Sequence, residues 1–291
     1  MTTHELRWRF PVPGSFADES HDGQWIVRWE GVALMGILNV TPDSFSDGGD
    51  FAAVTDAIRH ARQLVFEGAL VVDVGGESTR PGAAAIDTAV EISRVVPVIE
   101  ALHDDGDVLI SVDTRHAAVA EAALKAGAHI VNDISGLRDQ RMIDVCAHAG
   151  VPVAIMHMQG DPDTMQLNPT YGDVVTEVAE YLDAAAERAL RAGVPSVMID
   201  PGLGFGKTVD HNLKLLRGVK NLGQFPVLVG ASRKRFIGTL TNTPEPKDRL
   251  PGTIAAHLIA SQNGAAMVRV HDVAAHRQAF VIIESAENGG R

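Results

Sequence analysis

The chain has 291 residues, 45% of them hydrophobic, a mean hydropathy of +0.05 and a formal net charge of −12. This size allows one large core or two smaller domains, and the acidic balance argues against nucleic acid as a partner without excluding a small anionic ligand. Its only cysteine, Cys146, rules out an internal disulfide, and we find neither a signal peptide nor a run of the roughly 20 apolar residues that span a bilayer, so we expect a cytoplasmic protein without membrane contact.

Residues 1–32 form an extension that precedes the repeating part of the chain. Segments 6–10 and 25–29 both alternate apolar and polar residues, and a stretch rich in Pro, Gly and Asp separates them. Alternation on both sides of turn-forming residues predicts a β-hairpin with a long loop. We expect this hairpin to plug the bottom of the main domain, which we assign to residues 33–291 as a single unit.

From residue 33 onward, short apolar runs alternate with helical stretches. The apolar runs are 33–38, 70–74, 108–112, 129–131, 153–156, 197–199, 226–229 and 266–270. The helical stretches are 52–68, 87–103, 115–126, 139–149, 171–192, 208–219, 251–263 and 273–286. Strict alternation favours a parallel sheet, and eight units in about 260 residues predict an α/β fold, the (β/α)₈ TIM barrel. An open doubly wound sheet is the alternative, weakened because no G-x-G-x-x-G follows the first run.

Acceptor side chains follow several of the apolar runs directly. They are Asn39, Asp113, Asn132, Asp133 and Asp200. Because chemistry in a barrel lies at the carboxyl ends of its strands, these groups would converge on a flat ligand with several N–H donors. A metal ion is a rival occupant, although the sequence shows no clear His/Asp/Glu constellation at ligand spacing. A purely structural role in pairing lysines and capping helices is the other alternative.

A second group of residues at the same ends is basic. It consists of Arg80, Lys207, Arg233, Lys234, Arg269 and His271. Cations gathered at the sites of an acidic protein indicate an anionic ligand such as a carboxylate or a phosphate. The loop 200–207 is glycine-rich without P-loop spacing, and its Phe205 either walls a pocket for an aromatic ring or packs on the rim. Small polar and glycine residues in 39–49 and 75–83 are typical of mobile lids.

Eight motifs in the chain closely resemble dihydropteroate synthases. They are MGILNVTPDSFSDGG (35–49), DVGGESTRPGA (73–83), SVDT (111–114), VNDISG (131–136), MHMQG (156–160), DPGLGFGK (200–207), VGASRKRFIG (229–238) and VRVHDV (268–273). The resemblance runs from about residue 33 to the carboxyl terminus. It implies condensation of 6-hydroxymethyl-7,8-dihydropterin pyrophosphate with 4-aminobenzoate, giving 7,8-dihydropteroate and pyrophosphate in folate biosynthesis.

The resemblance also implies roles for individual residues. The pterin would be bound by Asp113, Asn132, Met156, Asp200 and Lys234. Pyrophosphate would be held by Arg269, His271 and, through Mg²⁺, Asn39, with Asp43 and Ser44 closing over it. The 4-aminobenzoate pocket would contain Thr79, Arg80, Pro81, Phe205 and Ser232. The residues expected to take part in catalysis are Asp113, Lys234 and Asp43.

Two other functions remain open from the sequence. A pterin-dependent methyltransferase would share the acceptor residues, but would not need the segment Ser232-Arg233-Lys234 or the motifs at 39–49 and 75–83. A non-catalytic pterin-binding homologue should have lost loop residues that this chain keeps. The resemblance further implies a homodimer formed through barrel helices. We also expect sulfonamides to compete for an unaltered 4-aminobenzoate pocket, and the length leaves no room for a fused pyrophosphokinase domain.

Overall fold

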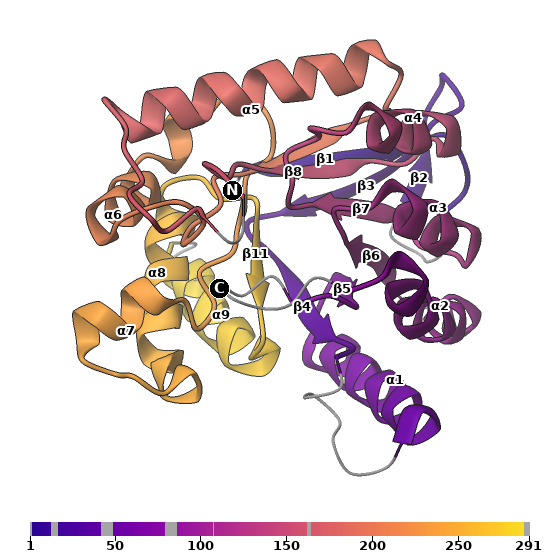
Figure 1. Ribbon diagram of the computed structural model, residues 1–291, viewed down its shortest axis with the longest axis horizontal. Coiled ribbons are helices and arrows are strands. Elements are labelled where there is room, and N and C mark those ends of the chain that lie inside the picture. Colours follow the sequence, from indigo (N-terminus) through magenta and orange to yellow (C-terminus); the bar gives the residue numbers. More distant parts are fainter. Residues whose placement is uncertain are drawn as a thin grey trace.

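The computed structural model describes residues 2–12, 17–41, 49–78, 86–106, 108–161 and 164–287, and it describes only the backbone of 49–53. Eight parallel strands form the centre of the molecule (Figure 1). They are β4 (Ala33–Asn39), β5 (Val71–Gly75), β6 (Leu109–Asp113), β7 (Ile130–Asp133), β8 (Val153–Met156), β9 (Val197–Asp200), β10 (Leu228–Val229) and β11 (Met267–Val270). Their order is β10-β11-β4-β5-β6-β7-β8-β9, and a parallel bridge between Ile199 and Val227 closes the ring. The predicted (β/α)₈ barrel is confirmed.

The helices surround these strands, as Figure 1 shows. They are α1 (Gly49–Glu67), α2 (Thr88–Asp105), α3 (Ala117–Lys125), α4 (Gln140–Ala149), α5 (Val174–Arg191), α6 (Val209–Arg217), α7 (Arg235–Thr241), α8 (Leu250–Gln262) and α9 (Val273–Glu287), with 3₁₀ turns at Val219–Asn221 and Pro246–Arg249. The short α7 was not predicted, because seven residues are too few for an amphipathic period to stand out. It follows β10 and brings two basic residues, Lys234 and Arg235, to the carboxyl end of the barrel.

The strands are buried on both faces, which explains their continuous apolar runs. Every residue of β5, β7, β8 and β9 is buried. Parallel strands covered by helices outside and packed side chains inside need apolar residues at successive positions rather than alternation. A polar residue in such a strand is therefore a feature that requires a specific partner.

Residues before β4 form a small antiparallel sheet in the order β1-β3-β2. The predicted hairpin arms are β1 (Thr3–Trp8) and β3 (Trp25–Glu30), which pair along six residues, and the short β2 (Ala17–Glu19) adds a third strand. Trp8 is fully buried and its Nε1 donates to the carbonyl of His129, 2.7 Å away, while Trp29 Nε1 donates to the carbonyl of Ala266 at 2.8 Å. Both carbonyls immediately precede the amino ends of barrel strands. The sheet therefore covers the end of the barrel opposite the predicted site.

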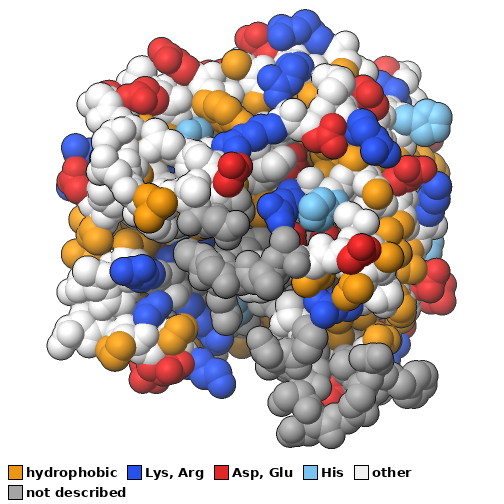
Figure 2. Space-filling view, viewed as in Figure 1, with side chains coloured by type: hydrophobic (Ala, Val, Ile, Leu, Met, Phe, Trp, Pro, Cys, Tyr) orange, Lys and Arg blue, Asp and Glu red, His pale blue; other side chains and the backbone are white. Residues whose placement is uncertain are grey.

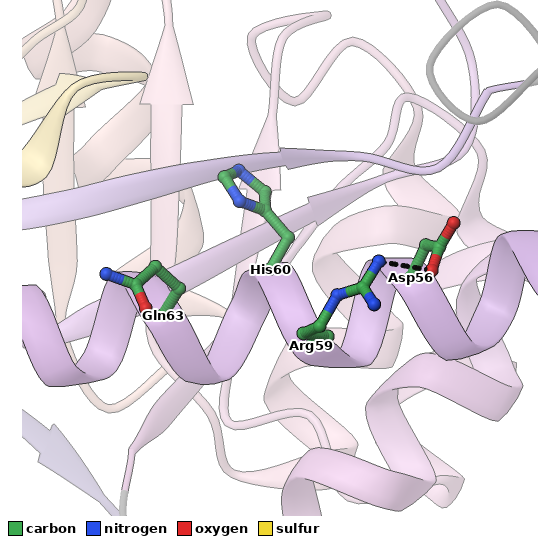
Figure 3. Close-up of a pocket in the computed structure, with 4 residues that line it drawn as sticks. All are labelled: Asp56, Arg59, His60 and Gln63. Atoms are coloured by element: carbon green, nitrogen blue, oxygen red, sulfur yellow. Dashed lines mark hydrogen bonds and ion pairs between the residues drawn. The ribbon is translucent and has the colours of Figure 1, made fainter.

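The surface carries both signs of charge in close alternation. On the face drawn in Figure 2, acidic and basic side chains are scattered rather than gathered in one patch. A depression along α1 is lined by Asp56, Arg59, His60 and Gln63, of which Arg59 and Asp56 form an ion pair on the outer side of the helix (Figure 3). Among the described helices, none combines the length and the apolar character needed to cross a membrane.

Candidate active site

Four neighbouring strands place one row of residues at the carboxyl end of the barrel. The row consists of Asn39, Gly75, Asp113 and Asn132, aligned by the pairing of β4 to β7. Side chains in register on adjacent strands point to the same face of a sheet, here the inside of the barrel. Gly75 contributes no side chain, and a Cβ there would lie 3.5 Å from Cβ of Asp113. The row therefore presents one carboxylate and two amides around an open position.

Arg269 of β11 reaches two carboxylates inside the barrel. Its Nε lies 2.5 Å from Oδ2 of Asp73, and its Nη2 lies 2.6 Å from Oδ2 of Asp113. Asp73 Oδ2 also accepts a hydrogen bond of 3.0 Å from Nδ2 of Asn132. Asp73 is fully buried and was not predicted as a site residue, because it lies inside the run of β5 rather than at its end. Its signal in the sequence is a single acidic residue among valines.

The electrostatics of this centre follow from burial and from the one guanidinium. Burial raises the pKa of Asp113 to about 7, with Asp73 adding to the rise and Arg269 opposing it. Burial alone would lower the pKa of Arg269, but the two carboxylates overcome it and the net shift is upward. Two carboxylates thus share one permanent cation, and the centre has a negative excess whenever both are ionised. Such a centre favours a ligand with N–H donors or a developing positive charge.

Asp200, at the end of β9, forms the second acidic position of the site. Its Oδ1 accepts a 2.7 Å hydrogen bond from the backbone N–H of Gly202, and burial raises its pKa while Lys234 opposes the rise. Lys234 has a pKa lowered to about 8 by burial, with Asp200 and Asp113 opposing that shift. Its Nζ lies 3.9 Å from the centre of the Phe205 ring, a cation–π contact. Asp113, Asp200 and Lys234 are therefore brought to one site, as predicted from the strand ends.

An apolar cluster borders these charges. It contains Ile134, Met156, Met158, Met165 and Phe205 and is separate from the main core. Met156 pairs in register with Asp200, so β8 and β9 present an apolar and an acidic side chain side by side. The predicted pterin-packing residue and the predicted aromatic wall thus belong to one cluster. A flat ring between this cluster and the acceptors would have both the apolar contact and the hydrogen bonds that it needs.

Lys207 does not point toward a ligand, although its position in 200–207 predicted an anion contact. Its Nζ lies 3.0 Å from Nδ1 of His157 and donates to the carbonyls of His157 and Phe205 at 3.3 and 2.9 Å. All three ammonium protons therefore have acceptors inside the protein, and burial lowers the pKa of Lys207 to about 7. Gly202, at a φ of +64°, lies so close that a Cβ would clash with the carbonyl of His157. The loop is thus held tightly against the segment after β8.

Arg233 also has a different role from the predicted one. Its Nη2 and Nε lie 2.7 and 3.2 Å from the two carboxylate oxygens of Asp272, a bidentate ion pair between the loops that follow β10 and β11. The same two loops are joined by Ser232, whose Oγ lies 2.8 Å from Nδ1 of His271. Arg233 has a φ of +58°, and its N–H donates to Oγ1 of Thr253 at 3.0 Å. The positive charge of Arg233 is therefore paired with Asp272 rather than directed at an anionic ligand.

Asp133 turns away from the row of acceptors. It follows Asn132 on β7, so it faces the opposite side, and its carboxylate accepts from Ser135 and from the N–H of Leu137 at 2.8 Å. Asp133 therefore has the capping role that was the alternative interpretation of these acceptors, and Asp200 also accepts from a nearby backbone N–H, that of Gly202. The predicted residues Asp43, Ser44, Thr79, Arg80 and Pro81 lie outside the described part of the chain.

A further polar cluster lies beside the site, where the sequence indicated no metal-ligand constellation. Nε2 of His116 is 3.6 Å from Oε2 of Glu77 and 3.9 Å from Oε2 of Glu91, and the three side chains could hold a metal ion. Glu77 and Glu91 lie in the loop and the helix after β5, whereas His116 follows β6, so ligand spacing in the sequence could not reveal them. Arg115 pairs with Glu77 at 3.0 Å, so one of the two carboxyl groups already has a cationic partner within the protein.

The arrangement favours electrostatic over covalent catalysis. Cys146 lies in α4, away from the strand ends, and burial raises the pKa of its thiol to about 12. A thiol with that pKa supplies no thiolate near neutral pH. The charged groups Asp113, Lys234 and Arg269 instead surround one position at which a leaving anion and a developing cation could both be stabilised.

Comparison with known proteins gives consistent results. A family model described as pterin binding enzyme matches residues 35–271. The curated dihydropteroate synthase of Escherichia coli K12 is 46% identical over 256 residues, which covers 87% of this chain and 90% of that protein. The Xanthomonas albilineans dihydropteroate synthase solved with 4-aminobenzoic acid has a TM-score of 0.85 at 45% identity, covering 90% of this chain and 95% of the other. The Thermus thermophilus dihydropteroate synthase in complex with 6HMPPP has a TM-score of 0.78 at 45% identity, with coverages of 89% and 96%.

Proposed function

The chain belongs to the dihydropteroate synthases, and from this premise we propose which of its residues bind each substrate and which act on the reacting bond. The reaction joins 6-hydroxymethyl-7,8-dihydropterin pyrophosphate to 4-aminobenzoate and releases pyrophosphate. The observation that carries our assignment is the Arg269 guanidinium shared between Asp73 and Asp113 beside the Asp200–Lys234 pair. It sets a negative centre next to cations at one end of the barrel.

The pterin ring binds, in our assignment, to Asp113, Asn132 and Asp200. An aminopyrimidine edge offers several N–H donors, and these three side chains supply buried oxygens that face into the barrel. Met156 packs against the ring from the neighbouring apolar cluster, and Lys234 donates to a ring acceptor. Asp73 belongs to the same subsite, where it orients Asn132 through the 3.0 Å hydrogen bond and holds Arg269.

The pyrophosphate group binds to Arg269, His271 and Asn39. Arg269 is one-fifth exposed toward the site although two carboxylates hold it, so part of its guanidinium is available to a ligand. We propose that Mg²⁺ accompanies the pyrophosphate. The protein supplies for it one neutral oxygen from Asn39, which fits an ion that keeps several waters and takes most of its other ligands from phosphate. Bound there, the ion would neutralise charge on the leaving group.

The 4-aminobenzoate site lies, in our assignment, between Phe205 and Ser232, with Thr79, Arg80 and Pro81 completing it from the loop after β5. Phe205 offers a ring face next to the pterin subsite. Ser232 lies at the start of the loop after β10 and is held by His271. The relatives solved with 4-aminobenzoic acid and with 6HMPPP support two adjoining subsites.

The chemistry then needs no covalent intermediate with the protein. The bond between the exocyclic methylene carbon and the pyrophosphate oxygen breaks, and its electron pair leaves with pyrophosphate toward Arg269 and His271. Positive charge spreads from the methylene carbon into the pterin ring, where the Asp113 carboxylate stabilises it. The neutral arylamine attacks the methylene carbon and then loses one proton. Asp43, in the loop after β4, closes over the leaving group in this proposal.

We further propose a cytoplasmic homodimer. Exposed apolar side chains on adjoining helices, Leu240 of α7 and Ile259 of α8, support a contact through the barrel helices. The buried free thiol of Cys146 is compatible with a reducing compartment.

One assay tests the function as a whole. Pyrophosphate release from the pterin substrate is followed with and without 4-aminobenzoate, while product formation is measured in parallel. We expect 4-aminobenzoate to accelerate release and to appear in 7,8-dihydropteroate in equal amount. Tight pterin binding without any release would instead identify a non-catalytic homologue, and methyl transfer from a folate would identify a methyltransferase.

A further inference from the structure

Two histidines that take no part in the proposed chemistry form a buried hydrogen-bond chain beneath the site. His257 of α8 and His276 of α9 are both completely buried, and Nδ1 of His257 lies 2.9 Å from Nε2 of His276. At one end, the backbone N–H of Ala231 donates to Nε2 of His257 at 3.0 Å. At the other end, Nδ1 of His276 lies 2.7 Å from the carbonyl oxygen of Asp272. The chain therefore joins the loop after β10 to the loop after β11.

The partners at the two ends determine the protonation state of both rings. A backbone N–H can only donate, so Nε2 of His257 is unprotonated and its Nδ1 carries the hydrogen. That hydrogen is donated to Nε2 of His276, whose own Nδ1–H donates to the Asp272 carbonyl. Every ring nitrogen is satisfied, and a second proton would face a donor on either ring: the Ala231 N–H at Nε2 of His257, or the His257 Nδ1–H at Nε2 of His276. In agreement with this, burial lowers the pKa of both histidines, with His276 adding to the shift of His257 and Asp272 opposing the shift of His276.

The chain is the innermost of three links between the same loops. The outer two are the Ser232–His271 hydrogen bond and the Arg233–Asp272 ion pair. Thr253 of α8, one helical turn before His257, accepts from the N–H of Arg233 at 3.0 Å, so α8 fixes two backbone amides of the first loop. The ion pair among the outer links joins two side chains that are about one-quarter exposed, whereas both rings of the histidine chain are completely buried.

We propose that His257 and His276 are positioning residues for the pyrophosphate site, an inference that rests on the function proposed above. They act through Ala231 and Asp272, which flank Ser232 and His271, and they set the distance between the two loops before any ligand binds. The pterin acceptors Asp113, Asn132 and Asp200 lie on β6, β7 and β9, and of the residues assigned to the pterin only Lys234 lies in the loop after β10. Loss of the histidine chain should therefore weaken pyrophosphate binding much more than pterin binding.

The test compares two ligands that each report one subsite. Inorganic pyrophosphate with Mg²⁺ and 6-hydroxymethyl-7,8-dihydropterin are titrated separately into the full-length protein by calorimetry. His257→Leu should weaken pyrophosphate binding roughly tenfold, the effect of one lost hydrogen bond to a buried backbone group, and leave pterin binding within about twofold. His257→Gln should recover much of the loss, because its amide oxygen can accept from Ala231.

His129→Leu is the matched control. His129 is also buried, and its Nδ1 also accepts from a backbone N–H, that of Ile110 at 3.0 Å, but it lies at the opposite end of the barrel. This variant should lower the melting temperature with both affinities unchanged. If His257→Leu fails to fold, His276→Gln is judged by the same two titrations. In the wild type, two-bond ¹H–¹⁵N spectra should show both rings of the pair neutral with hydrogen on Nδ1.

The inference is overturned by wild-type pyrophosphate affinity in the folded His257 or His276 variant. It is equally overturned by an equal loss for both ligands, or by the same selective loss in the His129 control. Failure of the proposed function is a different result, because the wild-type protein would then release no pyrophosphate in the turnover assay.

Discussion

Replacing Asp113 by asparagine tests the electrostatic centre most directly. The change keeps the shape and removes the charge that our mechanism uses to stabilise the pterin cation. One such contact is worth a factor of ~10²–10³ in rate, so we expect turnover and pyrophosphate release to fall together by about that amount. Free pyrophosphate should bind at least as tightly as to the wild type, because Arg269 then faces one carboxylate, Asp73, instead of two.

Asp113→Asn should also change the pH dependence of kcat/KM for the pterin substrate. The pKa of Asp113 is raised to about 7 by burial, so in the free enzyme its ionised form is lost as pH falls through that value. Because kcat/KM reports the free enzyme, kcat/KM for the pterin substrate should decline below about pH 7, by roughly tenfold per unit. Asp113→Asn should lack this limb, and any decline that persists in it belongs to the substrate's own phosphate groups.

Asp133→Asn provides the matched control on the neighbouring strand. It removes a buried carboxylate close to Asp113, but one that faces away and caps the turn at Ser135 and Leu137. It should cost about 1 kcal/mol of stability, the usual value of a lost capping bond, and keep both turnover and the acid limb. Normal turnover in Asp113→Asn, or an equal rate loss in Asp133→Asn, would refute the reasoning.

The remaining predictions concern the other parts of the site. Sulfonamides should compete with 4-aminobenzoate, because their aniline and acidic groups suit the pocket at Phe205 and Ser232; purely noncompetitive inhibition kinetics would reject that pocket. Exhaustive chelation should abolish turnover and added Mg²⁺ should restore it, whereas full activity in the chelated enzyme would remove the ion from the mechanism. Arg80→Ala should raise the KM for 4-aminobenzoate roughly tenfold, about the loss of one charge-assisted contact, and leave pterin binding nearly intact in a direct titration; loss of pterin binding would contradict its assignment. Burial raises the pKa of Glu91 from 4.5 to about 7, so the folded state binds the carboxyl proton more tightly than the unfolded state does. This contribution to the stability of the fold is therefore lost as the pH rises from 4.5 through about 7. Glu91→Gln should therefore gain up to roughly 3 kcal/mol relative to the wild type at pH 8 but little at pH 4, as measured by urea unfolding, and equal effects at both values would contradict the shift.

The barrel itself could be predicted because its determinants are local. Each apolar run and each amphipathic helix is encoded within a short segment, and strict alternation leaves few topologies. The elements that were missed, β2 and α7, have three and seven residues, too few for a period to be recognised. Their positions are set by the elements they pack against rather than by their own sequence.

The site was predictable only where a residue's position in its strand determines its direction. Asp113 and Asp200 end apolar runs and do face the site. Asp73 was missed because the same logic assigns a mid-strand residue to the core, and only the placement of Arg269 on another strand shows why a carboxylate can be buried there. Arg233 was assigned to a ligand because its partner, Asp272, is 39 residues away in sequence.

The three-stranded sheet at the other end of the barrel has a consequence for how this enzyme can change under selection. Trp8 and Trp29 bind carbonyls at the amino ends of the strands, whereas the charged residues to which we assign the substrates lie at the carboxyl ends. The contacts that stabilise the amino end of the barrel and the residues of the proposed site therefore lie in separate regions of the chain. Substitutions that reduce binding of a competitive inhibitor can lower the stability of the loops around the pocket. Further substitutions near Trp8 and Trp29 can restore that stability without changing a residue of the proposed site. In a population evolving resistance, the compensating changes should therefore accumulate in residues 1–32, at the end of the barrel opposite the proposed pocket.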